Sequence, residues 1–272
     1  MLARFDFTRP RTIVVAAVVL GAVAGLAGAV FHSVATEPRI DEAIAIEEAA
    51  AEAAPTEPGA DHADGDDEDV SVSRGDQRGV GLFAAYALTG AAFGLFLAIA
   101  SLSLRTTTGG PFRRVAVSGA ILAGAVSVAP WLKYPPNPPA VGDPDTVGER
   151  ERLYVLMIVL AALALAGLAH LSARLRRAGW PDDRRVAAVV LAGLVTFGVL
   201  FAALPPSPDT VGVPANLVWQ FRLNSLTGNL LVWTLLTLGL GVVWTEAARS
   251  AARATERAAQ NSMPLSAEIP SS

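Results

Sequence analysis

Three side chains suited to metal ligation lie close together where the first long apolar stretch of the sequence ends. His32 is near the end of that stretch, and Glu37 and Asp41 follow shortly after it. Imidazole nitrogen and carboxylate oxygen are common ligands of divalent metals, so these residues are candidate metal ligands. A single histidine beside an apolar stretch can equally be an amphipathic anchor, and the sequence leaves both interpretations open.

A short motif containing an aspartate occurs twice. PDTVG stands at 144–148 and again at 208–212, each time after a cluster of prolines. Asp143, Asp145 and Asp209 are therefore further candidate metal ligands. The competing interpretation is a rigid turn, because proline fixes φ, aspartate bonds its own backbone and glycine accepts a positive φ. The recurrence also predicts a parallel repeat of two helix hairpins.

Acidic residues dominate the segment from Glu37 to Arg78, which holds fourteen acids and three arginines for a net charge of −11. Its first half, 36–54, predicts a helix, because it starts with a capping threonine and places acids in the first turn. Its second half, 55–79, has no apolar periodicity and is expected to be disordered. That half, which includes His62, either attracts cations or serves as a solvated linker.

Several kinds of chemistry have no support in the sequence. There is no cysteine, which excludes disulfides and a thiolate metal site. No nucleotide-binding loop, nucleophile–base set or zinc-protease helix is present, so neither an enzyme nor a permanently bound cofactor is expected. The net charge of −4 gives no reason to expect a nucleic-acid partner.

Six apolar segments must position these residues, and each is close to the ~20 residues that a helix needs to cross a bilayer. None of them contains Asp, Glu, Lys or Arg, although the chain has 21 basic and 25 acidic residues. One charge at the centre of a membrane helix costs about 2.5–3.5 kcal/mol. The sequence therefore predicts an all-α polytopic membrane protein with about six transmembrane helices. The segments are 13–34, 80–104, 115–132, 153–171, 186–204 and 226–244.

The distribution of basic residues predicts the orientation in the membrane. Fourteen of the 21 lie in the N-terminal segment, the second and fourth connectors and the C-terminal tail. Basic residues near helix ends stay on the cytoplasmic side, so both termini are expected in the cytoplasm. The first apolar run is an alternative candidate for a signal peptide, although it exceeds the usual core of about 7–15 residues.

These features divide the chain into four parts. Residues 1–34 are expected to form a cytoplasmic stub and the first span, and 35–79 an acidic extracytoplasmic loop. Residues 80–245 are expected to form a five-span membrane core, and 246–272 a partly disordered cytoplasmic tail.

Small residues inside the spans predict which helices lie close together. Gly21 and Gly25 in the first span, and Gly90 and Gly94 in the second, have the spacing of close helix–helix contacts. Proton-driven carriers usually keep a carboxylate deep in the membrane, and the six segments contain none. A self-sufficient proton-driven transporter is therefore not expected, whereas a passive or partner-assisted pathway is compatible with the sequence.

Three stretches of the sequence carry a family resemblance. They are HSVATEPRIDEAIAIEEAA after the first span, APWLKYPPNPPAVGDPDTVGERERLY, and LPPSPDTVGVP before the last span. Together they resemble CbtA, the family of the proposed cobalt-transporter membrane subunit. The resemblance implies uptake of Co²⁺ for cobalamin synthesis, beside a small membrane partner, CbtB, that carries a histidine-rich segment. The family is described with five predicted spans, whereas six are present here.

Two functions from different classes follow. The first is a membrane subunit for uptake of cobalt or a similar divalent transition metal. The second is a non-transporting membrane scaffold that binds another protein through its acidic outer loop. A membrane enzyme has the least support, because the spans contain single polar residues but no polar active-site constellation at any depth.

Overall fold

The computed structural model describes residues 9–53, 73–103, 109–139, 141–142, 144–208 and 212–261, and within these ranges it has helices and no strand. In the same ranges, six helices are long and apolar enough to cross a membrane, which confirms the predicted all-α polytopic architecture. The six are Pro10–Ala35, Arg74–Ser103, Pro111–Lys133, Val147–Arg177, Asp182–Ala203 and Ala215–Gln260.

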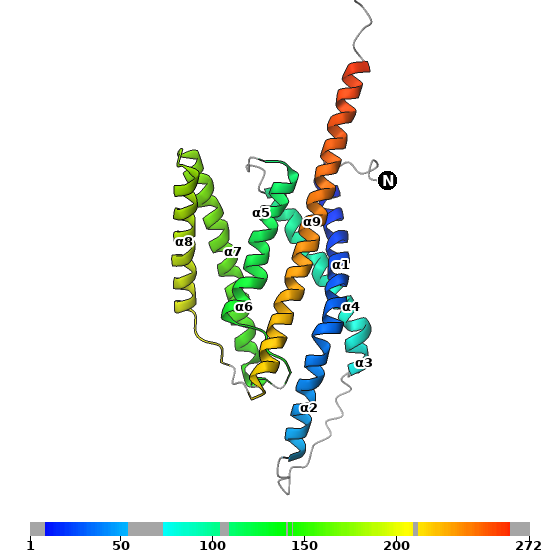
Figure 1. Ribbon diagram of the computed structural model, residues 1–272, viewed down its shortest axis with the longest axis vertical. Helices are drawn as coiled ribbons and strands as arrows, with labels where there is room; N and C mark the ends of the chain where they lie inside the picture. Colours follow the sequence, from blue (N-terminus) through cyan, green and yellow to red (C-terminus); the bar gives the residue numbers. More distant parts are fainter. Residues whose placement is uncertain are drawn as a thin grey trace, which may run out of the picture.

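Successive spans run in opposite directions along the bundle (Figure 1). α1 (Pro10–Ala35) starts at the end of the bundle at which α9 (Ala215–Asn261) leaves it. The other elements are α2 (Glu37–Ala53), α3 (Arg74–Asp76), the π-helix η2 (Gln77–Gly81), α4 (Leu82–Ser103), α5 (Pro111–Ala123), the π-helix η3 (Gly124–Val128), α6 (Ala129–Lys133), the 3₁₀ turn η4 (Pro144–Thr146), α7 (Val147–Arg177) and α8 (Asp182–Ala203).

The two ends of the bundle differ in composition. We call one end the arginine end; it holds Arg9, Arg11, Arg113, Arg114, Arg174, Arg176, Arg177, Arg184 and Arg185. We call the other the proline end; it holds Pro135, Pro136, Pro138, Pro139, Pro205, Pro206 and Pro208. The basic residues that the sequence assigns to one side of the membrane therefore do lie at one end of the described bundle.

Glycines bring α1 and α4 into backbone contact. A side chain at Gly21 would collide with the backbone carbonyl of Gly90, and one at Gly25 would collide with that of Tyr86. Gly94 is placed in the same way against Ala17. Close approach of this kind supplies the dispersion contacts that hold helices together in lipid, where burial from water gives no driving force. The predicted glycine contacts are thus present.

A buried tryptophan joins α9 to α4 and to the middle of the third span. Trp233 is 2% exposed and stacks on Phe93 with ring centroids 4.4 Å apart. Its indole N–H donates to Ser127 Oγ at 3.1 Å. Ser127 lies in η3, three residues before Pro130, whose missing N–H interrupts regular α-helical bonding. Its hydroxyl satisfies the single donor of the buried indole.

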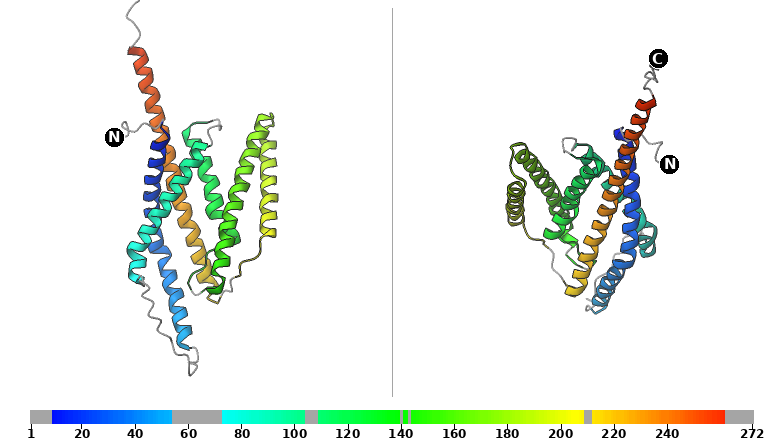
Figure 2. Two further views of the ribbon diagram at one scale, coloured as in Figure 1. Left: turned by 180° about the vertical axis from the view of Figure 1, so that it is seen from behind. Right: turned by 45° about the horizontal axis from the view of Figure 1, so that its top comes forward.

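α7 and α8 form a hairpin at the edge of the bundle. Gly179, with φ of 78°, ends α7, and α8 begins within a few residues. α7 packs against η3 and α6 through Met157 and Ala161, whereas none of the α8 residues is buried. Both views in Figure 2 place α8 on the side of the molecule far from α1.

The helices that flank the two PDTVG copies meet at the same end of the bundle but are packed differently. α6 and α8 both end at the proline end, and α7 and α9 both start there (Figure 1). Residues 209–211 of the second copy lie outside the described residues. α6 packs against α7, whereas α8 and α9 stand on opposite sides of α7. The two predicted hairpins, formed by the third and fourth spans and by the fifth and sixth spans, therefore run in the same direction, but the helices within each hairpin are packed differently.

The acidic segment begins with a helix, as the sequence predicts. α2 continues almost in line with α1, separated from it by Thr36, and extends beyond the proline end (Figure 1). Its Ala43 is fully buried, and the helix touches the start of α9. Of the stretch 55–79 that was predicted to be disordered, residues 55–72, with His62, lie outside the described residues. For its last residues the prediction was wrong, because 74–79 form α3 and the start of η2, which are held by Ser73 as N-cap and by ion pairs to α2.

Candidate functional site

The only lysine of the sequence fastens the end of α8 to α6. Lys133 Nζ donates to the carbonyl oxygens of Phe201 at 2.8 Å and Leu204 at 2.9 Å. These carbonyls belong to the last turn of α8, where the helix has no N–H groups left to pair them. A cation there also suits the negative end of the helix dipole. Lys133 therefore caps α8 from a neighbouring helix.

Two aromatic side chains next to Lys133 extend this connection. The Tyr134 hydroxyl donates to the carbonyl of Pro205 at 2.8 Å. Burial raises the pKa of Tyr134, so the phenol keeps the proton that this bond needs. The Trp131 indole donates to the carbonyl of Arg222 in α9 at 2.8 Å, and Arg222 Nη2 donates to Asn137 Oδ1 at 2.6 Å. The segment 131–137 thus joins α6, α8 and α9.

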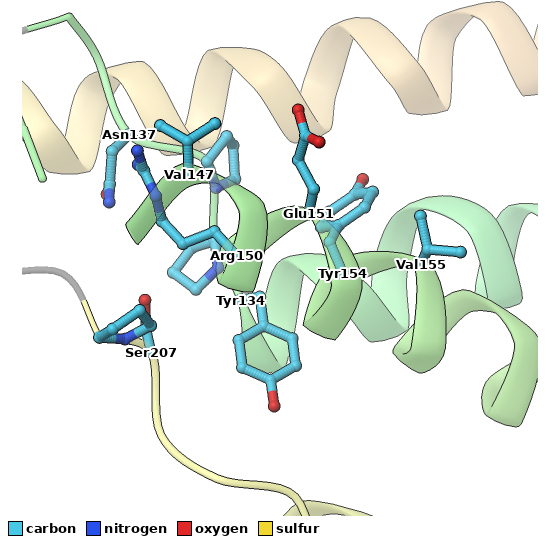
Figure 3. Close-up of a pocket in the computed structure, with 11 residues that line it drawn as sticks. Tyr134, Asn137, Val147, Arg150, Glu151, Tyr154, Val155 and Ser207 are labelled. Atoms are coloured by element: carbon cyan, nitrogen blue, oxygen red, sulfur yellow. The ribbon is translucent and has the colours of Figure 1, made fainter. Parts of the chain in front are cut away.

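These contacts form one wall of a pocket at the proline end. The pocket has a volume of about 520 Å³. Figure 3 shows the Arg150 side chain reaching toward Asn137, with Glu151 and Tyr154 adjacent on α7. The lining residues are Tyr134, Pro135, Pro136, Asn137, Val147, Arg150, Glu151, Tyr154, Val155, Ser207 and Pro208.

The sequence analysis did not single out the polar lining residues of this pocket. Glu151 and Ser207 contribute oxygen ligands, and Arg150 contributes a guanidinium. Such a mixture of charged and neutral polar groups can position a polar or hydrated solute. The available signal was the pair of proline-rich loops, since the pocket is lined by Pro135 and Pro136 of the first loop and by Pro208, the first residue of the second PDTVG copy.

The aspartates of the repeated motif lie beside this pocket or outside the described residues. Asp145 is in the 3₁₀ turn η4 that leads into α7, and its side chain is exposed. This is the position of a turn-forming residue. Asp143 and Asp209 fall outside the described ranges, so their metal ligation, like that of Asp145, stays a prediction.

His32 is buried where α1 meets α4 and α9. Its Nδ1 is 2.8 Å from Thr36 Oγ1, and its ring lies 4.7 Å from the Tyr86 ring. Among the described residues its Nε2 has no hydrogen-bond partner, and it rests against Gly228, where any side chain would collide with it. In this conformation neither ring nitrogen is directed at the predicted carboxylate ligands.

The two carboxylates that follow His32 instead bind two arginines. Glu37, only 6% exposed, accepts from Arg74 at 2.6 Å and lies 3.6 Å from Arg78. Asp41 is 3.4 Å from Arg74 and 3.1 Å from Arg78. We call these four residues the arginine–carboxylate cluster. It links the start of α2 to α3 and η2.

The cluster changes the interpretation of the predicted metal ligands. Guanidinium groups occupy the carboxylates that a cation would need, and within the described part of the chain no three His, Asp or Glu residues are grouped to hold a metal. The sequence analysis missed Arg74 and Arg78. A sequence pattern that could have indicated them is that they are two of only three arginines in the acidic segment from Glu37 to Arg78.

Comparison with known proteins agrees with the membrane architecture. No curated protein and no solved structure matches the chain significantly. A family model described as "Probable cobalt transporter subunit (CbtA)" matches residues 10–245, from the first residue of α1 to the membrane part of α9. That range contains the proline-end pocket and the arginine–carboxylate cluster. The chain therefore belongs to the CbtA family of probable cobalt transporter subunits.

Proposed function

We propose that this protein is the membrane subunit of a bacterial Co²⁺ uptake system, with its arginine end in the cytoplasm. The family match across all six spans is the observation that carries the proposal. The orientation is supported by the arginines gathered at one end, because basic residues near helix ends are retained on the cytoplasmic side. The protein then lies in the cytoplasmic membrane with α1 starting, and α9 ending, inside the cell.

In this orientation the acidic segment faces the outside and receives the cation. Its net charge of −11 raises the local concentration of divalent ions near the proline end. The predicted outer ligands are His32, Glu37 and Asp41, with Asp143, Asp145 and Asp209 on the other loops. Co²⁺ accepts both imidazole and carboxylate ligands.

The arginine–carboxylate cluster gives this step a mechanism. A cation that binds Glu37 and Asp41 must displace the guanidinium groups of Arg74 and Arg78. Those arginines belong to α3 and η2, and the neighbouring Gly79 has a non-helical backbone, with φ of −90° and ψ of −113°. Displacement would free this short segment to move about Gly79 and loosen α4 beside His32.

The low histidine content of the chain is compatible with a partner protein that supplies further metal ligands. The sequence has 3 histidines, and none of them forms a cluster. We propose that a small membrane partner with a histidine-rich segment, like CbtB, supplies further metal ligands and that the imported cobalt serves cobalamin synthesis. The family description as a subunit supports the existence of a partner.

Radiolabelled Co²⁺ uptake tests the proposal in a deletion strain that carries variants of the gene. Changing Glu37→Gln together with Asp41→Asn should lower uptake at limiting Co²⁺ on the order of tenfold. Glu42→Gln is the control, because Glu42 lies on the same helix and pairs with Arg39 at 2.7 Å. Uptake equal to that of the wild type in the double variant would remove Glu37 and Asp41 from the pathway.

A second double variant separates a metal role from a structural one. Arg74→Gln with Arg78→Gln leaves both carboxylates in place and removes their competitors. We expect tighter Co²⁺ binding to the purified protein by calorimetry. Weaker binding would mean that the arginines only hold α2 in place. Unchanged cobalt content in the deletion strain, with loss of a co-purifying protein, would instead favour the membrane-scaffold function.

A further inference from the structure

We propose that a pocket at the arginine end binds the phosphate of an anionic phospholipid. The pocket lies where α4, α5, α7 and the start of α8 meet, and it has a volume of about 520 Å³. It is separate from the proline-end pocket, at the opposite end of the bundle. The proposal rests on the membrane architecture and does not depend on cobalt transport.

The described residues that line this pocket include five basic side chains and no Asp or Glu. Arg113 comes from α5, His170, Arg176 and Arg177 come from α7, and Arg185 comes from α8. Arg185 also pairs with Asp182 at 2.9 Å, but Asp182 is 85% exposed on its side chain and is not part of the lining. Arg177 Nε donates to the carbonyl oxygen of Ala173 at 3.3 Å. Each guanidinium has five N–H donors, so arginines that already hold one partner keep further donors for a bound anion.

The chemistry of the basic groups fits a phosphate. Guanidinium groups donate paired hydrogen bonds in a plane, which matches two oxygens of a phosphate. Ser103 and Ser172 add hydroxyl groups to the same lining. Basic pockets between membrane helices are a known way of holding anionic lipid headgroups.

The rest of the lining identifies a lipid as the source of that phosphate. Farther into the spans the wall of the pocket is mainly apolar, with Val117, Ile121 and Leu122 of α5, and includes one hydroxyl, that of Ser118. A phospholipid can place its acyl chains along this wall while its phosphate meets the arginines. A free phosphate or a nucleotide would leave the wall without a partner.

The location of the pocket gives the lipid a structural task. α7 contacts the arginine-end half of the bundle through few residues, because its buried positions Leu153, Met157 and Ala161 all belong to its first half. A phosphate between Arg113 and the arginines of α7 would connect α5 to the α7–α8 hairpin at this end. Lys133 makes the corresponding connection at the proline end.

Native mass spectrometry of the full chain tests the proposal. The protein is purified in detergent and supplied with phosphatidylglycerol, phosphatidylethanolamine or inorganic phosphate. Retention of phosphatidylglycerol, with little of the other two, is expected. Arg176→Gln with Arg177→Gln should weaken that retention on the order of tenfold or more. Arg253→Gln with Arg257→Gln is the control, because it removes the same charge from an exposed part of α9.

Two further readouts keep the test decisive if the glutamine variant is unstable. Arg176→Lys with Arg177→Lys keeps the charge but loses the paired geometry, so retention should fall, whereas unspecific surface charge predicts no change. Phosphatidylglycerol should also raise the Tm of the wild type more than that of the lysine variant. Equal retention of all phospholipids, or retention of inorganic phosphate in their place, would overturn the proposal.

Discussion

α1 and α8 are alike in composition but opposite in environment. Their mean hydropathies are 2.6 and 2.5, yet 39% of the α1 window is buried inside the protein and none of the α8 window. α1 lies between α4 and α9, in backbone contact with α4, whereas α8 stands at the edge beside α7 (Figures 1 and 2). Apolar character therefore places a helix in the membrane without deciding what it touches.

The two helices differ in where their glycines lie. Gly21 and Gly25 of α1 share one face with a spacing of four, and Gly90 and Gly94 of α4 meet them. On α8, Gly193 touches the side chain of Leu168 and Gly198 faces no atom within contact distance. Glycines promote association in lipid only where another backbone can reach them.

A bulky residue in the α1–α4 contact should have the largest effect. Gly90→Leu would drive a side chain into the Gly21 carbonyl, and we expect a loss of about 3 kcal/mol in unfolding free energy, at the upper end for overpacking. Gly198→Leu on α8 is the matched control and should change stability by less than about 0.5 kcal/mol. Thermal unfolding in detergent measures both, and equal losses would contradict the comparison.

Loss of the lysine that caps α8 should have the next largest effect. Lys133→Met leaves the carbonyls of Phe201 and Leu204 without their donor, which should cost about 2 kcal/mol. Hydrogen exchange should rise in the last turn of α8 and stay unchanged in α1. Lys133→Arg should retain part of the stability. An equal rise in hydrogen exchange in all helices would show that Lys133 stabilises the whole bundle and not the α7–α8 hairpin in particular.

The indole hydrogen bond of the core should contribute less. Ser127→Ala removes the acceptor of the buried Trp233 N–H, and we expect a loss of about 1–2 kcal/mol. Thr196→Ala, on exposed α8, should have little effect by comparison. A shift in the fluorescence of Trp233 would report the altered environment, and an unchanged Tm would show that the indole finds another acceptor.

The smallest of these effects is expected at Tyr134. Tyr134→Phe removes one hydrogen bond to Pro205, at a cost of about 1 kcal/mol. Because the pKa of Tyr134 is raised, this contribution should be fully present below the ordinary tyrosine pKa and be lost only as pH rises through the raised value. The stability difference between wild type and variant should therefore be constant from pH 7 to pH 9.

Patterns that depend on neighbouring residues were predictable from the sequence. The six spans follow from uncharged segments of bilayer length, and the α1–α4 contact follows from the four-residue spacing of Gly21 and Gly25. The helix at the start of the acidic segment follows from its threonine and its acids. These features need no knowledge of distant partners.

Features that join distant residues were not predictable. Arg74 lies 37 positions from Glu37, and Lys133 lies 68 from Phe201, so no local pattern indicates either contact. The basic pocket collects Arg113, Arg176 and Arg185 from three helices. Likewise, His32 was predicted beside carboxylates, but helix packing turned its ring toward Thr36 and Gly228.

By itself, then, the sequence determined that the chain has six segments able to cross a membrane and that fourteen of its 21 basic residues flank them on one side. Both are consequences of the cost of moving charge into hydrocarbon, which each segment meets independently. Tertiary structure decided which of six similar helices became the buried core and which carboxylates met arginines. Those outcomes depend on the fit between surfaces far apart in the chain, and such fit exists only once the helices are packed.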